Sequence, residues 1–365
     1  GAEQLDESVY NNMLNADEIN SWYPDDVVPG TDGNTLPSFQ SATGLSFNDG
    51  GKPNTHRIRT VNTALTRKDD KNLVAEDGTT YNGYIYSNSG KNPDVYVALE
   101  LNAGDKVTVI AGSNGKESLI TFEGPDGIED QQNFTNLGGA QTMVFYPREN
   151  GVYKFWSATE KLVIARIYRQ RAKHTVVSGT VTQPAELKDY KLAFTNTTNG
   201  AVTAAQVGET GYSVELPAPF TYDISLLNAN GYVVKDFPTL TLDGQAASQS
   251  FDLTVEAVPL VTVSGKLTGL SQAALGNLEL TFHADTVYIP QVKVEGDTYT
   301  ATLAKGDTYT LGVSGVNDYD LTSAKEVTYS ADAKADVVFT AKPTHKVTIA
   351  PQGVDATALK TATFI

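Results

Sequence analysis

The sequence predicts an all-β chain in which several β-sandwiches follow one another. Tyrosine (18 residues) and phenylalanine (13 residues) are plentiful among recurring threonine, valine and glycine, a composition typical of pleated, half-buried strands. Short runs of alternating apolar and polar residues are separated by glycine, asparagine or aspartate, which indicates strands joined by turns. The back half of the chain also repeats itself, and this self-similarity indicates tandem copies of one fold.

Five segments are expected along the 365 residues, a length that suits two to four domains of roughly 100–200 residues each. They are an N-terminal extension (1–44), a jelly-roll β-sandwich (45–172), two immunoglobulin-like repeats (173–258 and 259–343) and the start of a truncated third repeat (344–365). All seven arginines precede residue 172, and the remainder of the chain uses only lysine. The two halves therefore differ in surface chemistry, which suggests different roles.

The N-terminal extension is acidic and irregular. A short helix is expected at 7–15, and several prolines then enforce a loop. In the following domain, alternation predicts strands at 56–65, 81–87, 94–101, 106–112, 117–123, 140–146, 151–157 and 161–169. The segments AGDKV and ENGVY are hairpin signals between these strands.

The two repeats match each other along their length. TVVSGTVT at residue 175 corresponds to VTVSGKLT at residue 261, GYSVEL around Tyr212 to DTYTATL around Tyr299, and SFDLTVEA to DVVFTAKP, with an offset of 86 to 88 residues throughout. The V-x-G-x-V strand followed by a Y-x-V-x-L hairpin resembles transthyretin-like modules of the carboxypeptidase-regulatory type. This resemblance implies an immunoglobulin-like sandwich.

A third copy begins at His345 and contains two strands, which cannot bury a core alone. Either the parent protein is longer, or the tail completes a neighbouring molecule, and truncation is the simpler account.

Residues 99–168 contain an A-G-x-x-V-T-V turn, a G-x-Y-x-x-x-S hairpin and the last strand LVIARIYR. These features resemble the jelly-roll modules attached to secreted pectate lyases and related polysaccharide-degrading enzymes. The resemblance implies a jelly-roll fold and a carbohydrate-binding role, and it identifies no ligand residue.

Composition excludes several classes of protein. The chain has no cysteine, which rules out disulfides, thiolate nucleophiles and cysteine-based zinc sites. Its formal charge of −16 repels nucleic acid and anionic lipid. No apolar run approaches the roughly 18–20 residues of a membrane-spanning helix, so no membrane insertion is expected. The expected partners are a polysaccharide and further domains of the same polypeptide.

No catalytic motif appears in the sequence. There is no G-x-S-x-G elbow, no G-x-x-x-x-G-K-[ST] loop and no histidine pair at metal-ligand spacing. Paired carboxylates for glycoside hydrolysis meet in space rather than in sequence, so that alternative stays open. We expect a non-catalytic fragment without a cofactor. Asp126, Glu129 and Asp130 offer oxygen ligands for a structural calcium ion, with solvated loops as the alternative.

Aromatic side chains are the candidates for carbohydrate binding, because the C–H faces of sugar rings stack on them. In strand 151–157, alternation puts Trp156 on the outer face beside Lys154. Tyr84 and Tyr86 share a face of an earlier strand. Two further candidates lie in the proline-bounded loop, Trp22 and Tyr23. The alternative is that these rings cover sheet edges or anchor the extension.

Basic residues are the second group of candidates. Arg57 and Arg59 share one strand face, and with Arg148 and Lys154 they would form a basic patch in an acidic domain. A planar guanidinium matches a carboxylate, so this patch would suit a uronate ligand such as pectin, whereas starch would not need it. The alternative is ordinary ion pairing at the surface.

These observations favour a carbohydrate-binding and spacer region of a polysaccharide-degrading protein, directed at a plant glycan such as pectin or starch. The alternative is a bacterial surface adhesin or stalk that binds host protein or matrix. Both hypotheses place the chain outside the cell, secreted or attached to the surface, and the absence of cysteine permits that location.

Overall fold

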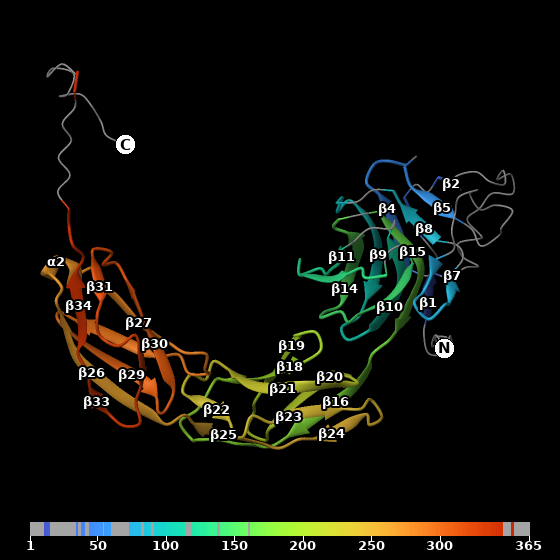
Figure 1. Cartoon of the computed structure of the whole chain (residues 1–365). Coiled ribbons are helices and arrows are strands. Elements are labelled where there is room, and N and C mark those ends of the chain that lie inside the picture. The colour runs from blue at the N-terminus through green and yellow to red at the C-terminus, as the bar shows by residue number, and fades with distance from the viewer. Residues whose placement is uncertain are drawn as a thin grey trace. The chain divides into compact units, whose positions relative to one another are not determined.

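In the computed structural model, the regular secondary structure of the described residues is almost entirely β-strand (Figure 1). The structure describes residues 11–14, 34–35, 38–40, 44–53, 55–59, 73–81, 84–88, 91–113, 119–136, 139–159, 161–345 and 352–353. Within these ranges the helical element is the single turn α2 (Gln272–Leu275), and no helix there is long and apolar enough to cross a membrane. The predicted all-β class is confirmed.

The chain divides into two compact units. Unit 1 comprises Gly1–Asn228 and Val234–Val255, and unit 2 comprises Ala229–Val233 and Glu256–Ile365. Unit 1 therefore holds the jelly roll together with most of the first repeat, and unit 2 holds the second repeat. We call residues 173–258 repeat 1 and residues 259–343 repeat 2.

The jelly roll consists of two antiparallel sheets. The seven-stranded sheet has the order β13-β10-β15-β8-β5-β2, with β1 paired to β15. Its strands are β1 (Asn11–Leu14), β2 (Asn34–Thr35), β5 (Arg57–Arg59), β8 (Tyr84–Ser87), β10 (Lys106–Ser113), β13 (Ala140–Phe145) and β15 (Leu162–Gln170). The six-stranded sheet has the order β12-β11-β14-β9-β4-β3. Its strands are β3 (Phe39–Gln40), β4 (Leu45–Asp49), β9 (Val95–Leu101), β11 (Leu119–Glu123), β12 (Glu129–Asn133) and β14 (Gly151–Ser157).

The inner faces of the two sheets form one apolar core. Phe122 of β11 stacks on Phe145 of β13 and on Tyr153 of β14, with ring centroids 4.5 and 5.0 Å apart. Phe155 lies in the same core, as the alternation of side chains in β14 predicts. The outer faces of both sheets therefore carry the side chains left for other contacts.

Several elements of the jelly roll differ from the sequence prediction. β12 has the polar sequence EDQQN, which shows no apolar alternation, and it forms by edge pairing with β11. Residues 11–14 pair with β15 as strand β1, so the helix predicted at 7–15 is wrong over these four residues. A small hairpin of β6 (Leu73–Val74) and β7 (Thr80–Tyr81) precedes β8. In the first two cases pairing with a neighbouring strand overrides local propensity.

The two repeats are sandwiches of short strands. Repeat 1 contains β16 (Lys173–Gly179), β17 (Val181–Thr182), β18 (Lys191–Asn196), β19 (Val202–Gln206), β20 (Tyr212–Ala218), β21 (Phe220–Leu227), β22 (Tyr232–Val234), β23 (Thr239–Leu242), β24 (Ser248–Ser250) and β25 (Leu253–Ala257). Repeat 2 contains β26 (Leu260–Thr268), β27 (Glu279–His283), β28 (Gln291–Glu295), β29 (Thr298–Ala304), β30 (Thr308–Ser314), β31 (Tyr319–Leu321), β32 (Glu326–Thr328), β33 (Ala333–Lys334) and β34 (Val337–Ala341).

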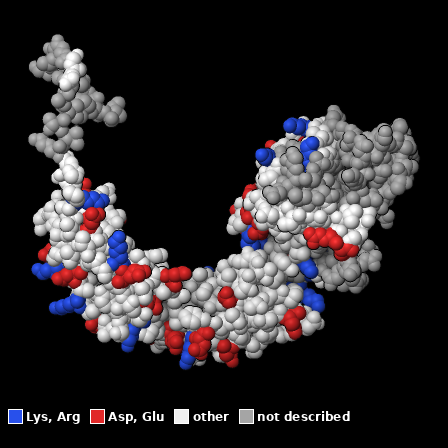
Figure 2. Space-filling model, viewed as in Figure 1, with Lys and Arg blue, Asp and Glu red and all other residues white. Residues whose placement is uncertain are grey.

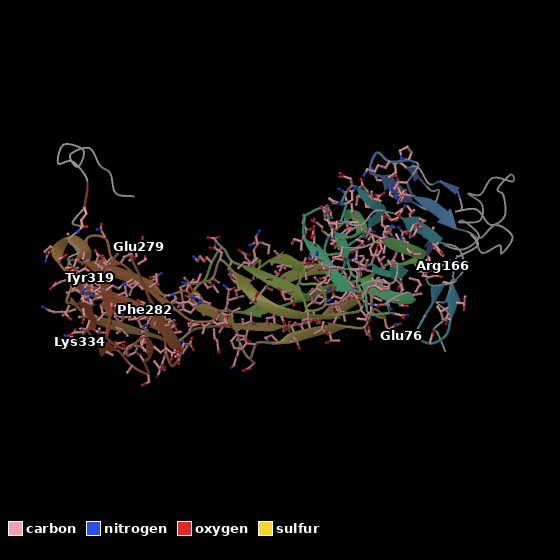
Figure 3. The ribbon with its side chains drawn as sticks, turned by 45° about the horizontal axis from the view of Figure 1, so that its top comes forward. Glu76, Arg166, Glu279, Phe282, Tyr319 and Lys334 are labelled. Atoms are coloured by element: carbon pink, nitrogen blue, oxygen red, sulfur yellow. The ribbon has the colours of Figure 1, made fainter. Side chains whose placement is uncertain are left out.

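Repeat 2 has its own apolar core and a mixed surface. Phe282, labelled in Figure 3, packs in this core with Tyr299 and Tyr309. Acidic and basic side chains are interspersed over its visible face (Figure 2). A surface of this kind favours solubility over binding to one charged partner.

In repeat 1 the first strand is held to the last by a close contact that we call the latch. A Cβ atom at Gly179 would lie 2.0 Å from the carbonyl oxygen of Phe251, so only glycine fits there. The hydroxyl of Tyr212 donates to the same carbonyl over 2.6 Å. The Asp252 carboxylate accepts the backbone N–H of Thr180 over 2.8 Å. The latch therefore joins three separate parts of the repeat.

Repeat 2 contains the same latch. Gly265 lies against the carbonyl of Ala335, Tyr299 donates to that carbonyl over 2.6 Å, and Asp336 accepts the N–H of Lys266. The glycine and tyrosine are offset by 86 and 87 residues from those of repeat 1, and the aspartate by 84 (336 − 252). The predicted match of SFDLTVEA with DVVFTAKP is therefore wrong by two residues, because the connection before the last strand is shorter in repeat 2.

Within unit 1, β15 runs into β16 with only Arg171 and Ala172 between them. The fully buried Asp105 accepts from the Arg171 guanidinium over 2.6 Å and from the Ala172 N–H over 3.1 Å. Gly104 has φ of +78°, and a Cβ atom there would lie 2.5 Å from Pro217 Cβ. These contacts dock repeat 1 directly on the β9–β10 turn of the jelly roll.

The latch predicts alkaline sensitivity. Burial, and to a lesser extent the charge of Asp252, raises the pKa of Tyr212 to about 12, and burial similarly raises the pKa of Tyr299 to about 12. The ordinary tyrosine value is about 10, so the stabilisation is complete below pH 10 and is lost as the pH rises through 12. Equilibrium denaturation across this range should show that loss.

Tyr212→Phe and Tyr299→Phe should each cost about 1–2 kcal/mol at pH 7, because the half-buried carbonyl of the latch loses its side-chain donor. Both variants should also flatten the alkaline loss of stability. An unchanged free energy of unfolding in both would contradict the latch.

Candidate functional site

The outer face of the seven-stranded sheet carries a group of tyrosines. In β8, Ile85 enters the core while Tyr84 and Tyr86 point to the other side. Tyr84 packs there with Ile110, Ala140, Val163 and Ala165, and Tyr81, Tyr86 and Tyr168 pack against this cluster. We call Tyr81, Tyr84, Tyr86, Arg166 and Tyr168 the tyrosine face. Apart from the buried Tyr84, its members are half-buried.

A β-bulge in β15 places Arg166 on this face. Ile110 of β10 pairs with Arg166 whereas Ala111 pairs with Ile164, so Ala165 is an extra residue. Ile164 and Ile167 enter the core on either side of the bulge, and Arg166 takes the outer position. Simple alternation would put Arg166 on the same side as Ile164, so this residue was not among the predicted candidates.

The β6–β7 hairpin brings Tyr81 to the tyrosine face. Ala75 forms a parallel bridge with Ala140, and the Asn136 amide donates to the Val74 carbonyl over 3.3 Å. The Arg166 guanidinium lies 5.8 Å from the centroid of the Tyr81 ring, within the range of a cation–π contact (Figure 3 labels Arg166).

Contacts in and beside the hairpin turn shift the pKa values of Tyr81 and Asp77. Burial raises the pKa of the Tyr81 phenol, and the nearby Asp77 charge adds to this, whereas Arg166 opposes it. The N–H of Thr79 donates to the Asp77 carboxylate over 2.9 Å and lowers its pKa. Asp77 is thus a turn residue, and Tyr81 stays a neutral ring at physiological pH.

The structure brings several predicted residues together on this face. Tyr84 and Tyr86 share it as predicted, but Tyr84 is only 8% exposed and so is not an open platform. β5 pairs Arg57 with Tyr86 and Arg59 with Tyr84, so both arginines occupy register positions beside the tyrosine face. Trp22 and Tyr23 lie outside the described residues.

Trp156 lies on the opposite side of the jelly roll. It is on the outer face of the six-stranded sheet, as predicted, but it is only 9% exposed and pairs with Thr121, which is fully buried. Its Nε1 has no hydrogen-bond partner in the described part of the chain. The predicted outer position of Trp156 is confirmed, but its ring is covered, because alternation fixes the face of a strand and not what packs on that face.

The predicted basic patch is also divided. Lys154 belongs to the six-stranded sheet, where its ammonium lies 4.9 Å from the Tyr96 ring centroid, whereas Arg57 and Arg59 belong to the seven-stranded sheet. The fourth residue of the patch, Arg148, is engaged in ion pairs. The four residues therefore do not act as one surface.

Arg148 forms ion pairs with the acidic loop that was predicted as a possible calcium site. Its guanidinium contacts Asp130 at 3.1 Å and Asp126 at 3.4 Å. Burial alone would lower the pKa of Arg148, but these two carboxylates raise it overall. Glu129 instead accepts from the Gln131 amide, and the described residues contain no group of three or more metal-ligating side chains. Calcium stays a prediction here, and it would have to displace Arg148.

Added calcium and a substitution of Arg148 together test whether this loop binds a cation. Millimolar calcium or a chelator should leave the melting temperature of the protein unchanged, because the Arg148 guanidinium already lies between the two carboxylates that calcium would need. Arg148→Ala should cost about 1 kcal/mol, whereas Lys52→Ala, at an exposed position of the same domain, should be neutral. A rise in melting temperature of the unmodified protein with calcium would show that the cation displaces Arg148.

No family model and no curated protein matches the chain. Among solved structures, it is similar to the CBM22-1–GH10 modules of an endo-1,4-β-D-xylanase from Clostridium thermocellum (12% identity over 42% of this chain and 32% of that one, TM-score 0.23). It is also similar to a putative adhesin from Bacteroides ovatus (10% identity, 41% of this chain and 70% of that one, TM-score 0.23). A third is a streptococcal ancillary pilin (13% identity, 64% and 94%, TM-score 0.27).

The chain spans about a third of the length of the xylanase chain, 32%. Similarities this distant do not indicate a function for the chain.

Proposed function

We propose that the jelly-roll domain binds polysaccharide through the tyrosine face, and that the two repeats act as spacers. The observation that carries this proposal is that Tyr81, Tyr86 and Tyr168 are half-buried rings on one sheet face together with Arg166. Half-buried tyrosines keep a fixed orientation and still offer part of the ring and the hydroxyl to a ligand. Sugar rings stack on such surfaces through their C–H faces.

The arginines on and beside the tyrosine face favour a polysaccharide that carries carboxylate groups. A planar guanidinium donates two parallel hydrogen bonds to a carboxylate, which a neutral sugar lacks. Arg166 lies on the tyrosine face, and Arg57 and Arg59 pair in register with its tyrosines. We therefore propose an acidic plant glycan such as pectin in preference to starch. Because the whole chain carries a charge of −16, the attraction must be local and should weaken with added salt.

We further propose that this region is non-catalytic and serves a larger secreted or cell-surface protein. Glycoside hydrolysis needs two carboxyl groups about 5–10 Å apart around the scissile bond. The described residues of the tyrosine face supply phenol and guanidinium groups. The acidic residues nearest in sequence are Glu76 and Asp77 in the hairpin turn, and Asp77 holds that turn together.

An exposed ring on repeat 1 favours the second candidate, a surface adhesin or stalk. Phe237 is 66% exposed and has a positive φ of 45°, directly after Asp236 at 62°. An exposed aromatic side chain of this size offers an apolar contact of the kind enriched in protein–protein interfaces. Binding of the full chain to an immobilised matrix protein, lost in Phe237→Ser, would favour the adhesin. Retained binding in that variant would remove this support.

The polysaccharide proposal is tested by affinity electrophoresis on polygalacturonate, xylan and starch. Polygalacturonate should retard the protein most. Tyr86→Ala should weaken that retardation about tenfold, since it removes a stacking surface worth about 1.4 kcal/mol. Tyr96→Ala is the matched control, because Tyr96 is a half-buried outward tyrosine on the other sheet.

Arg166→Gln should reduce binding to polygalacturonate and leave any binding to starch unchanged. Absence of retardation on all three gels, or equal losses in the Tyr86 and Tyr96 variants, would overturn the proposal.

A further inference from the structure

A separate cavity of about 330 Å³ lies where the jelly roll meets repeat 1, wholly inside unit 1. Pockets for small ligands typically span roughly 300–1,000 Å³, so this one suits a single sugar residue. It is formed by the start of β10, the end of β13, the β15–β16 connection and the turns around β21 and β23. The tyrosine face contributes none of the residues that line it.

The walls of this junction pocket are held in place before any ligand binds. Tyr146 of the jelly roll meets Phe220 of repeat 1 edge to face, with ring centroids 5.5 Å apart. The Asn199 amide of repeat 1 donates to the Tyr146 and Pro147 carbonyls, over 3.4 and 3.0 Å. The buried Asp105 fixes the connection at Arg171. Because these walls are already ordered, ligand binding would cost little conformational entropy of the side chains.

The charge of the pocket is opposite to that of the chain. Lys106, Arg171 and Lys173 line it beside Asp243, and Asp105 pairs with Arg171, so three cations stand against two carboxylates in a protein of formal charge −16. The Asp105 partner of Arg171 lies behind the wall and is fully buried. The Lys173 side chain passes over Gly244, where its Cδ lies 3.5 Å from the position of a Cβ atom. The lining therefore favours an anion.

The remaining lining suits a ring with hydroxyl groups. Tyr146 and Phe220 supply an aromatic wall, and Gln170 and Gln245 supply amide donors and acceptors. We propose that the junction pocket binds the carboxylate-bearing ring of a uronic acid, with the carboxylate toward Lys173 and Arg171 and one ring face toward Tyr146. This site is independent of the tyrosine face, and it would let repeat 1 take part in ligand binding.

The test is calorimetric titration of the full chain with sodium D-galacturonate at low ionic strength, with D-galactose and acetate as comparisons. Galacturonate should bind saturably, galactose should not bind, and acetate should bind more weakly because it lacks the ring. Lys173→Gln and Gln245→Glu, both at exposed side chains, should each weaken binding about tenfold, the effect of one lost or one repelling charge (~1.4 kcal/mol).

Two control variants distinguish binding in this pocket from binding elsewhere on the chain. Lys188→Gln removes an exposed lysine of repeat 1 outside the pocket and should leave galacturonate binding unchanged. Tyr86→Ala should also leave it unchanged, even where polysaccharide retardation is lost, so the two sites can fail separately.

The proposal is overturned if galacturonate does not bind or if acetate binds as tightly. It is equally overturned if the Lys188 variant matches the Lys173 variant, or if Tyr86→Ala abolishes the titration.

Discussion

The two sheets of the jelly roll pack through their inner faces, and this packing decides which side chains remain for a ligand. Phe122, Phe145 and Tyr153 fill the space between the sheets, so alternation sends the remaining side chains outward. The bulge at Ala165 interrupts that alternation in β15 and places Arg166 on the outer face. The tyrosine face therefore depends on both the shared core and one local irregularity.

The latch explains why glycine and tyrosine mark the repeats. Gly179 and Gly265 allow the first strand to approach a carbonyl that no larger residue could tolerate, and Tyr212 and Tyr299 satisfy the same carbonyl. The sequence motif V-x-G and the tyrosine that follows are thus parts of one contact, which persists while the loops between them vary in length. This is a structural role, and it accounts for these tyrosines without a ligand.

Much of the fold could be predicted from the sequence, because strand periodicity and the repeat are local signals. The all-β class followed from composition and alternation, and the shared face of Tyr84 and Tyr86 followed from alternation. The predictions that were wrong or incomplete concern contacts between segments that lie far apart in the sequence. The burial of Trp156, the ion pairs of Arg148 and the strand at residues 11–14 are all set by neighbours far along the chain. The junction pocket has no sequence signal, since two domains form it.

Amide chemical-shift mapping of the full chain can show whether the tyrosine face binds an acidic glycan. Addition of an oligogalacturonate should shift amides of β7, β8 and β15, together with those around the junction pocket. Shifts confined to β9 and β14 on the opposite sheet, or no shifts in the jelly roll, would mean that the tyrosine face does not bind the glycan.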